Sequence, residues 1–169
     1  IYLRKDELQS KNLKSLYFGG GTPSILSVDE IHSLLDEILQ YFTFDENIEI
    51  TLEANPDDLN ANYLKQLSKT PINRLSIGTQ SFFDEDLHLM NRAHNSSEAE
   101  SSIKRAQDFG FENLSIDLIY GSPTSSLEIW KKNLQKTIDL QVPHISSYAL
   151  TVESKTLLSN WISKNKIEK

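Results

Sequence analysis

The sequence predicts an α/β fold in which parallel strands alternate with helices. Five short runs of apolar, β-branched and aromatic residues have the composition of buried strands. Segments with the helical period of apolar residues lie between these runs. Polar residues stand where several of the strands end, and ligands bind at that edge in parallel α/β proteins.

The five predicted strands follow one another along the whole chain. They are Leu13–Phe18, Ile48–Leu52, Arg74–Ile77, Leu114–Ile119 and His144–Tyr148. A segment with helical periodicity separates each strand from the next. Strands alternating with helices require right-handed crossovers, so the strands should pair in parallel.

The helix after the first strand has the clearest signals. Ser27 and Glu30 have the spacing of a capping box, and apolar residues between positions 31 and 42 share one face. The same spacing predicts a second capping box at Ser125 and Glu128, before the last strand. Weaker helical patterns cover Asn60–Leu67 and Ser97–Phe109.

We expect residues 1–169 to form a single domain, because 38% hydrophobic residues in a chain of this length suit one core. The β/α order fits either an open doubly wound sheet or part of a β/α barrel. A complete eightfold barrel needs about 250 residues. This chain is long enough for an arc of a partial barrel with about five strands.

Composition excludes several classes of function. A net charge of −7, with 17 scattered Lys and Arg residues, argues against nucleic-acid binding. No apolar run approaches the roughly 20 residues that span a bilayer, so we expect no membrane-spanning segment and a cytoplasmic protein. The chain has no cysteine, and its four histidines do not pair at metal-binding spacing, so we expect no metal site within it.

The polar residues at the strand ends are the candidate site. Gly19, Gly20, Gly21 and Thr22 follow the first strand, and Glu53, Gln80 and Asp117 follow or lie within the next three. Because parallel strands end on one face, we expect Glu53, Gln80 and Asp117 to converge. Asp117 is the strongest pointer, since a carboxylate inside an apolar strand is costly without partners. The simpler interpretations are a tight glycine turn and structural or solvated carboxylates.

Six sequence motifs together resemble one known family. They are YFGGGTPSIL (17–26), LEANPDDL (52–59), RLSIGTQSF (74–82), NRAH (91–94), IDLIYGSP (116–123) and HISSYALTVESKT (144–156). In order and spacing they resemble the radical S-adenosylmethionine family, in its group of oxygen-independent coproporphyrinogen III oxidases and haem chaperones. The resemblance covers nearly the whole chain and implies a partial (β/α) barrel of the radical S-adenosylmethionine type.

The resemblance also implies the cofactors of a longer protein. They are S-adenosylmethionine and a four-iron four-sulfur cluster, which a CxxxCxxC loop holds in that family. We expect this loop before Ile1, which makes Leu13–Phe18 the second strand of the barrel, and a substrate-binding portion beyond the chain. We therefore expect the 169 residues alone to bind neither cofactor tightly and to contain no catalytic residue.

Ten positions of this sequence match cofactor-binding positions of the family. They are Gly19, Gly20, Gly21, Thr22, Glu53, Gln80, Arg92, Asp117, Tyr148 and Thr151. The resemblance places the glycines and Thr22 at the methionine amino end, Glu53 at the cofactor end of the site, and Gln80 and Asp117 near the ribose. It places Arg92 against the methionine carboxylate and Tyr148 and Thr151 beside the adenine.

The resemblance favours a haem chaperone over a true oxidase. The residues Arg92-Ala93-His94 and the motif at 144–156 look more like the chaperone branch. Haem or coproporphyrinogen III is then the expected partner of the full-length protein, in addition to S-adenosylmethionine. Three alternatives stay open: an oxidase that decarboxylates propionate side chains, a non-enzymatic nucleotide-binding β/α module, and an inert structural domain.

Overall fold

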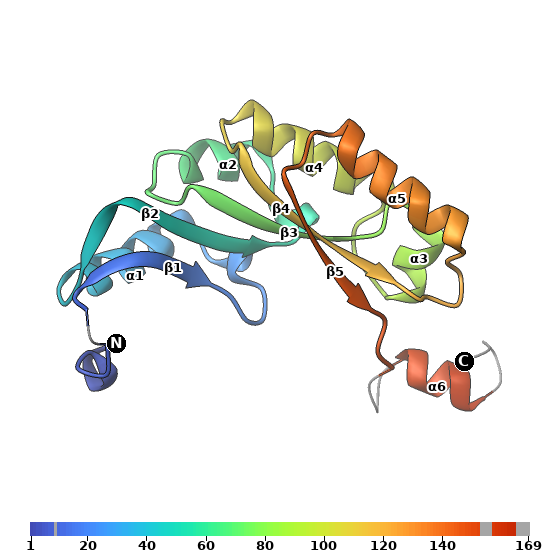
Figure 1. Ribbon diagram of the computed structural model, residues 1–169, viewed down its shortest axis with the longest axis horizontal. Coiled ribbons are helices and arrows are strands. Elements are labelled where there is room, and N and C mark those ends of the chain that lie inside the picture. The colour runs from blue at the N-terminus through green and yellow to red at the C-terminus, as the bar shows by residue number, and fades with distance from the viewer. Residues whose placement is uncertain (9, 153–156, 165–169) are drawn as a thin grey trace.

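The computed structural model describes residues 1–8, 10–152 and 157–164, and its centre is a five-stranded parallel sheet (Figure 1). The strands are β1 (Asn12–Phe18), β2 (Thr43–Ala54), β3 (Arg74–Gln80), β4 (Asn113–Tyr120) and β5 (His144–Ala149). Their order in the sheet is their order in the chain. The predicted parallel β/α arrangement is confirmed.

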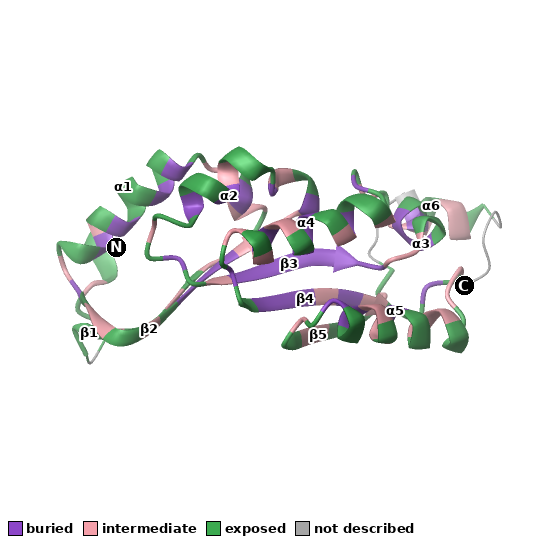
Figure 2. Ribbon diagram, turned by 90° about the horizontal axis from the view of Figure 1, so that it is seen from above, coloured by how far each residue is buried: buried purple, intermediate pink, exposed green. Residues whose placement is uncertain are grey.

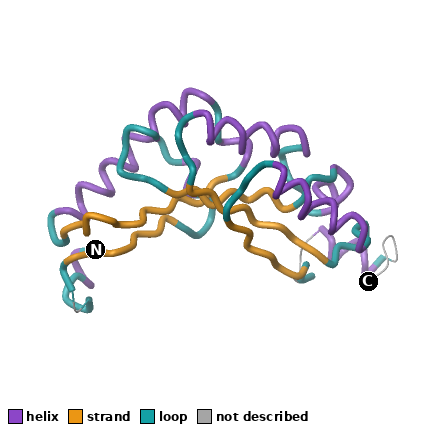
Figure 3. Tube along the Cα trace, turned by 45° about the horizontal axis from the view of Figure 1, so that its top comes forward, coloured by secondary structure: helices purple, strands orange, loops and turns teal. Residues whose placement is uncertain are grey.

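The described residues form six α-helices. They are α1 (Val28–Leu39), α2 (Ala61–Leu67), α3 (Asp84–Leu89), α4 (Ser96–Asp108), α5 (Leu127–Asp139) and α6 (Leu157–Ser163). Helices α1, α2, α4 and α5 lie on the convex side of the curled sheet, and the concave side carries no such layer in the part of the chain described (Figures 1 and 3). A doubly wound sheet would have helices on both faces, so the partial barrel is the correct alternative.

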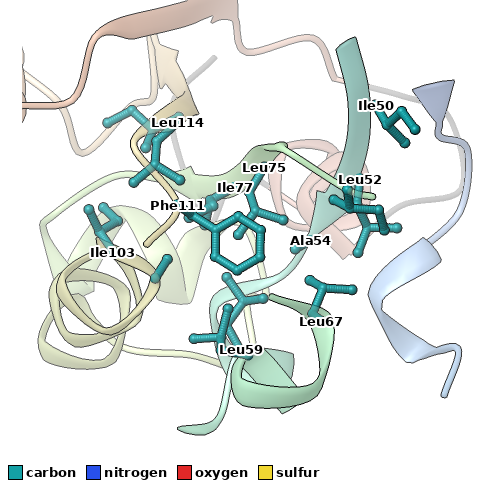
Figure 4. Close-up of a cluster of buried hydrophobic side chains, with 14 of the residues drawn as sticks. Ile50, Leu52, Ala54, Leu59, Leu67, Leu75, Ile77, Ile103, Phe111 and Leu114 are labelled. Carbon is teal, nitrogen blue, oxygen red and sulfur yellow. The ribbon is translucent and has the colours of Figure 1, made fainter. Parts of the chain in front are cut away.

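The core lies between the sheet and these helices. Successive strand side chains point to opposite faces, and the set that faces the helices is apolar. Leu52, Leu75, Ile77 and Leu114 are fully buried and pack with Ile103 of α4 (Figure 4). The strands β3 and β4 are the most buried elements, whereas β5 at the edge is mostly exposed (Figure 2). The apolar alternation therefore fixes which side chains face the concave side.

Strand β2 is much longer than the sequence predicted. The prediction was Ile48–Leu52, whereas the strand runs from Thr43 to Ala54. Its polar first half pairs with the beginning of β1 through backbone groups, and the Thr43 amide donates to the Lys11 carbonyl at 2.8 Å. Phe44 and Ile48 pack against the core, but Glu46 interrupts the two-residue alternation between them, so the apolar pattern did not extend the predicted strand.

The helix caps agree in part with the sequence prediction. Helix α1 begins with the predicted capping box of Ser27 and Glu30. The box predicted at Ser125 and Glu128 is wrong, because the N-cap of α5 is Ser126, whose hydroxyl accepts from the Ile129 amide at 3.2 Å. Within the described residues, no helix has both the length and the apolar character that crossing a bilayer demands.

Candidate cofactor site

A polar cavity of about 190 Å³ lies at the carboxyl ends of β1 to β4. Residues in or just after these four strands line it, and the loop between α3 and α4 contributes one more residue. The lining residues are Gly21, Thr22, Pro23, Glu53, Ala54, Asn55, Ser76, Gly78, Gln80, Arg92 and Asp117. The side chains expected to converge, those of Glu53, Gln80 and Asp117, thus lie around one cavity.

Glu53 is fixed at the wall of the cavity by two donors, one from β1 and one from the loop that follows it. The Tyr17 hydroxyl donates to Oε1 at 2.7 Å, and the Gly20 amide donates to Oε2 at 3.0 Å. Burial, followed by the hydrogen bond to Glu53, raises the pKa of Tyr17 to about 12, so the phenol keeps its proton at neutral pH. The Glu53 carboxylate is therefore held in one orientation before any ligand binds.

The glycines after β1 are required for two reasons, space at Gly19 and positive φ angles at Gly20 and Gly21. A Cβ atom on Gly19 would lie 2.5 Å from a ring carbon of Tyr17 and 3.1 Å from Cδ of Glu53, so a side chain there would separate this pair. Gly20 and Gly21 have φ angles of 86° and 67°, which other residues adopt at a cost. The tight-turn interpretation is correct for Gly20 and Gly21, while Gly19 is needed for the close packing of Tyr17 and Glu53.

Asp117 lies on β4, opposite Ser146 of β5, and strand β3 separates it from Glu53 on β2, whose charge still acts on it. Burial raises the pKa of Asp117, and the charge of Glu53 raises it further, while the hydroxyls of Ser146 and Ser76 act in the opposite direction. Two carboxylates facing one cavity repel each other unless a cation or hydrogen-bond donor enters between them. The site is thus prepared for a ligand with a positive group or hydroxyl donors.

Arg92 supplies the cationic group of the cavity. Burial lowers the pKa of Arg92, while the negative charges of Asp117 and Asp57 act in the opposite direction. The loop that carries it turns at Asn91, whose φ of 53° is left-handed, a conformation that Asn adopts more readily than most residues. The Arg92 amide donates to the Leu87 carbonyl at 2.9 Å, which ties the loop back to α3. The site therefore presents a planar guanidinium, which suits a carboxylate.

Gln80 reaches the cavity through an unusual turn. Its φ is 67°, and the Ser81 amide donates to the Thr79 carbonyl at 2.8 Å across it. This three-residue turn with positive φ is rare and strained. The β3–β4 ladder shifts register at the same point, between Ile77 and Gln80. A Cβ atom on Gly78 would lie 3.1 Å from the Gln80 amide nitrogen, so the absent side chain leaves room for the carboxamide.

The remaining predicted residues lie outside the cavity lining. Gly19 and Gly20 contact Glu53 without lining the cavity, and Tyr148 and Thr151 are exposed and do not line it either. The end of the motif at 144–156, residues 153–156, lies outside the described residues. The sequence prediction missed Ser76, Gly78 and Asn55. The two-residue period backwards from Gln80 would have found Ser76 and Gly78.

The lining groups fit S-adenosylmethionine but not an iron–sulfur cluster. The cofactor has an ammonium, a carboxylate and ribose hydroxyls, and the cavity offers carboxylates, a guanidinium and a carboxamide. A cluster requires thiolates, and the sequence has no cysteine. Among the described residues, no group of three or more His, Asp or Glu side chains could bind a metal ion.

Replacing Tyr17 with Phe is expected to weaken binding of S-adenosylmethionine by the full-length protein about threefold to tenfold. The Phe ring keeps the packing but removes the donor to Glu53, and a hydrogen bond to a charged group at a partly exposed position contributes about 1 kcal/mol. Calorimetric titration measures the effect, with Tyr41→Phe as the control far from the cavity. Equal affinities of Tyr17→Phe and wild type would show that Glu53 needs no orientation by the phenol.

Comparisons with known proteins identify the scaffold that carries this cavity. The family model described as the radical SAM superfamily matches residues 2–136. The solved structure of coproporphyrinogen III oxidase from Escherichia coli superposes with a TM-score of 0.80 and 27% identity. It covers 94% of this chain and 37% of the oxidase chain. An Elp3 structure from Methanocaldococcus infernus, 20% identical with a TM-score of 0.77, shares the fold, covering 98% of this chain and 43% of its own.

The curated relatives in sequence include several proteins named heme chaperone HemW. The protein of Haemophilus influenzae is 42% identical over 155 residues, which are 92% of this chain and 40% of the relative. The protein of Bacillus subtilis is 38% identical over 92% of this chain and 41% of its own length. The chain thus spans about two fifths of the length of these relatives. Because the superfamily model matches most of the sequence and the folds agree, the chain belongs to the radical S-adenosylmethionine superfamily.

Proposed function

We propose that the cavity binds S-adenosylmethionine and that the chain is part of a haem chaperone. The observation that carries the first half is the convergence of Glu53, Asp117, Gln80 and Arg92 on one cavity at the strand ends. The family of the chain and the chemistry of these four side chains support the same ligand.

The groups of the cavity match the groups of the cofactor by charge. The methionine end of S-adenosylmethionine carries an ammonium and a carboxylate, so it needs both an anion and a cation. Glu53 and the turn at Gly20–Thr22 receive the ammonium, and Arg92 pairs with the carboxylate. Asp117 and Gln80 accept hydrogen bonds from the ribose hydroxyls. Tyr148 and Thr151, on the neighbouring strand end, flank the adenine.

Bound S-adenosylmethionine, together with a reduced iron–sulfur cluster, supplies the 5′-deoxyadenosyl radical in this superfamily. The residues of this chain bind and orient the cofactor. Glu53 and the half-buried guanidinium of Arg92 select its zwitterionic end, and Asp117 at the end of β4 orients the ribose.

Haem chaperoning by the full-length protein is supported by the curated relatives. Four bacterial proteins named heme chaperone HemW are 37–42% identical over 90–92% of this chain. Oxidative decarboxylation of coproporphyrinogen III is the second candidate, because the E. coli oxidase has the same fold over 94% of the chain. Haem or a porphyrinogen is then the partner, and a cytoplasmic location stays a prediction.

The test is a calorimetric titration of the full-length protein, with its cluster reconstituted, by S-adenosylmethionine and separately by ATP. We expect saturable binding of S-adenosylmethionine and much weaker binding of ATP, which has no ammonium or carboxylate for Glu53 and Arg92. Equal binding of both would favour a general nucleotide-binding module. Transfer of haem to an acceptor apoprotein, compared with decarboxylation of coproporphyrinogen III, then separates the two candidate functions.

The 169-residue chain alone is expected to take up no iron–sulfur cluster and to cleave no S-adenosylmethionine. It has no thiolate to bind iron. Anaerobic reconstitution with iron and sulfide, followed by iron counting and by chromatography of the cofactor products, measures both properties. Stoichiometric iron bound to the desalted chain would contradict the expectation.

A further inference from the structure

The loop that presents Arg92 also contains a buried histidine that does not line the cavity. The side chain of His94 is only 2% exposed. Its Nε2 atom lies 3.2 Å from the carbonyl oxygen of Thr79 on β3. A carbonyl only accepts hydrogen bonds, so Nε2 must carry the proton of this contact. The imidazole is thus a donor from the α3–α4 loop to the end of β3.

The carbonyl that His94 contacts closes the strained turn around Gln80. It already accepts the Ser81 amide at 2.8 Å, and His94 is its second donor. A turn in which a non-glycine residue has a φ of 67° persists only where its surroundings hold it in place. Ser81 is held on its other side by Asp86, which accepts the Ser81 hydroxyl at 2.8 Å. The turn is therefore fixed at both of its ends.

The other ring nitrogen of His94 faces the segment after β2. Its Nδ1 atom lies 3.6 Å from Oδ1 of Asp57, too far for a good hydrogen bond but close enough for an electrostatic contact when the ring is charged. The charge of Asp57 also acts on Arg92. The imidazole therefore lies between the turn that presents Gln80 and the carboxylate beside Arg92.

We propose that His94 is a positioning residue for the cofactor cavity. By donating to the Thr79 carbonyl, it stabilises the strained turn that directs the Gln80 carboxamide into the cavity. The proposal rests on the proposed function, because the carboxamide matters only if a ligand occupies the cavity. A histidine that merely fills space in the core would tolerate an apolar residue of similar size.

Three substitutions in the full-length protein separate the two contacts. His94→Gln places an amide nitrogen where Nε2 is and retains the donor to Thr79, while His94→Asn places one where Nδ1 is and retains only the contact with Asp57. His94→Leu keeps the bulk and loses both. We expect affinity for S-adenosylmethionine to fall about tenfold in the Leu and Asn variants, the loss of one buried hydrogen bond, and less than about threefold in Gln.

A second readout needs no cofactor. Hydrogen exchange of the Ser81 amide reports whether the turn is closed, because this amide donates to the same carbonyl. We expect exchange to be about tenfold faster in His94→Leu and close to wild type in His94→Gln. His88→Leu is the matched control, since His88 is exposed on α3, three residues before Asn91.

A double-mutant cycle with Gln80→Ala tests whether His94 affects cofactor binding through Gln80. If His94 acts through Gln80, His94→Leu should weaken cofactor binding little further once the carboxamide is gone. Additive losses, or a Gln variant as impaired as the Leu variant in a folded protein, would overturn the proposal. If wild type binds no S-adenosylmethionine, the proposed function fails. Hydrogen exchange tests the positioning role separately. A Ser81 amide that exchanges in His94→Leu at the wild-type rate would refute that role.

Discussion

Replacing Asp117 with Asn is expected to weaken binding of S-adenosylmethionine by the full-length protein about tenfold to a hundredfold. The amide keeps the shape of the side chain but loses the charge that accepts the ribose hydroxyl. A hydrogen bond to a charged group contributes about 1.5–3 kcal/mol, which corresponds to this range of affinity. Calorimetric titration measures it, with Asp36→Asn on the exposed face of α1 as the matched control.

The same substitution is expected to make the ligand-free protein more stable at neutral pH. Burial and the neighbouring charge of Glu53 raise the pKa of Asp117. A raised pKa means that the folded state binds the proton more tightly than the unfolded chain, so protonation favours folding. Above that pKa the ionised carboxylate lowers the free energy of unfolding, and Asn removes this penalty. The difference between variant and wild type should vanish as the pH falls and Asp117 becomes protonated.

Asp117→Asn is thus expected to weaken cofactor binding and to raise the free energy of unfolding. Replacing a carboxylate that only stabilises the fold would lower the free energy of unfolding instead. Urea unfolding at neutral and acidic pH measures stability without the cofactor. A variant that binds S-adenosylmethionine normally, or that is less stable than wild type at neutral pH, would contradict the role assigned to Asp117. Cofactor binding by wild type should also weaken as the pH falls through the raised pKa of this carboxyl group.

Replacing Arg92 with Ala is expected to weaken S-adenosylmethionine binding by a similar factor, about tenfold to a hundredfold, with the largest loss at low ionic strength. The guanidinium is the counter-charge for the methionine carboxylate, and salt screens part of this attraction. Its removal also takes away a positive charge that interacts with Asp117 and Asp57, while Arg74 still acts on Asp117. Titrations at low and high ionic strength measure the effect.

Arg92→Lys is the matched variant, because it retains the charge without the planar pair of donors. We expect it to bind more tightly than Arg92→Ala and less tightly than wild type. Iron content should be unchanged in all three proteins, since Arg92 supplies no ligand to a cluster. A loss that does not depend on ionic strength, or a Lys variant as weak as Ala, would show that Arg92 acts through packing instead.

The sequence predicted the architecture because burial imposes a pattern. Leu52, Ile77 and Leu114 belong to apolar runs, and these runs became the neighbouring strands whose helix-facing side chains form the core. The choice between an open sheet and a barrel arc could not be made from periodicity, since both have the same β/α order. The resemblance to a known family decided it, and the helices on one face confirm the choice (Figure 3).

The site was predictable where it depends on strand ends and not where it depends on local backbone geometry. Glu53 and Asp117 converge because parallel strands end together. The strained turn at Gln80 has no sequence signature, because glycine is the usual residue at positive φ. The link from His94 to this turn joins residues 15 positions apart, so it appears only in three dimensions.

The most direct test of the central claim is a crystal structure of the full-length protein with S-adenosylmethionine bound. The account predicts the methionine end of the cofactor against Gly21, Thr22 and Glu53, its carboxylate within ion-pair distance of Arg92, and ribose hydroxyls hydrogen-bonded to Asp117 or Gln80. Density for the cofactor elsewhere, with the Asp117 and Arg92 side chains contacting each other or solvent only, would contradict it.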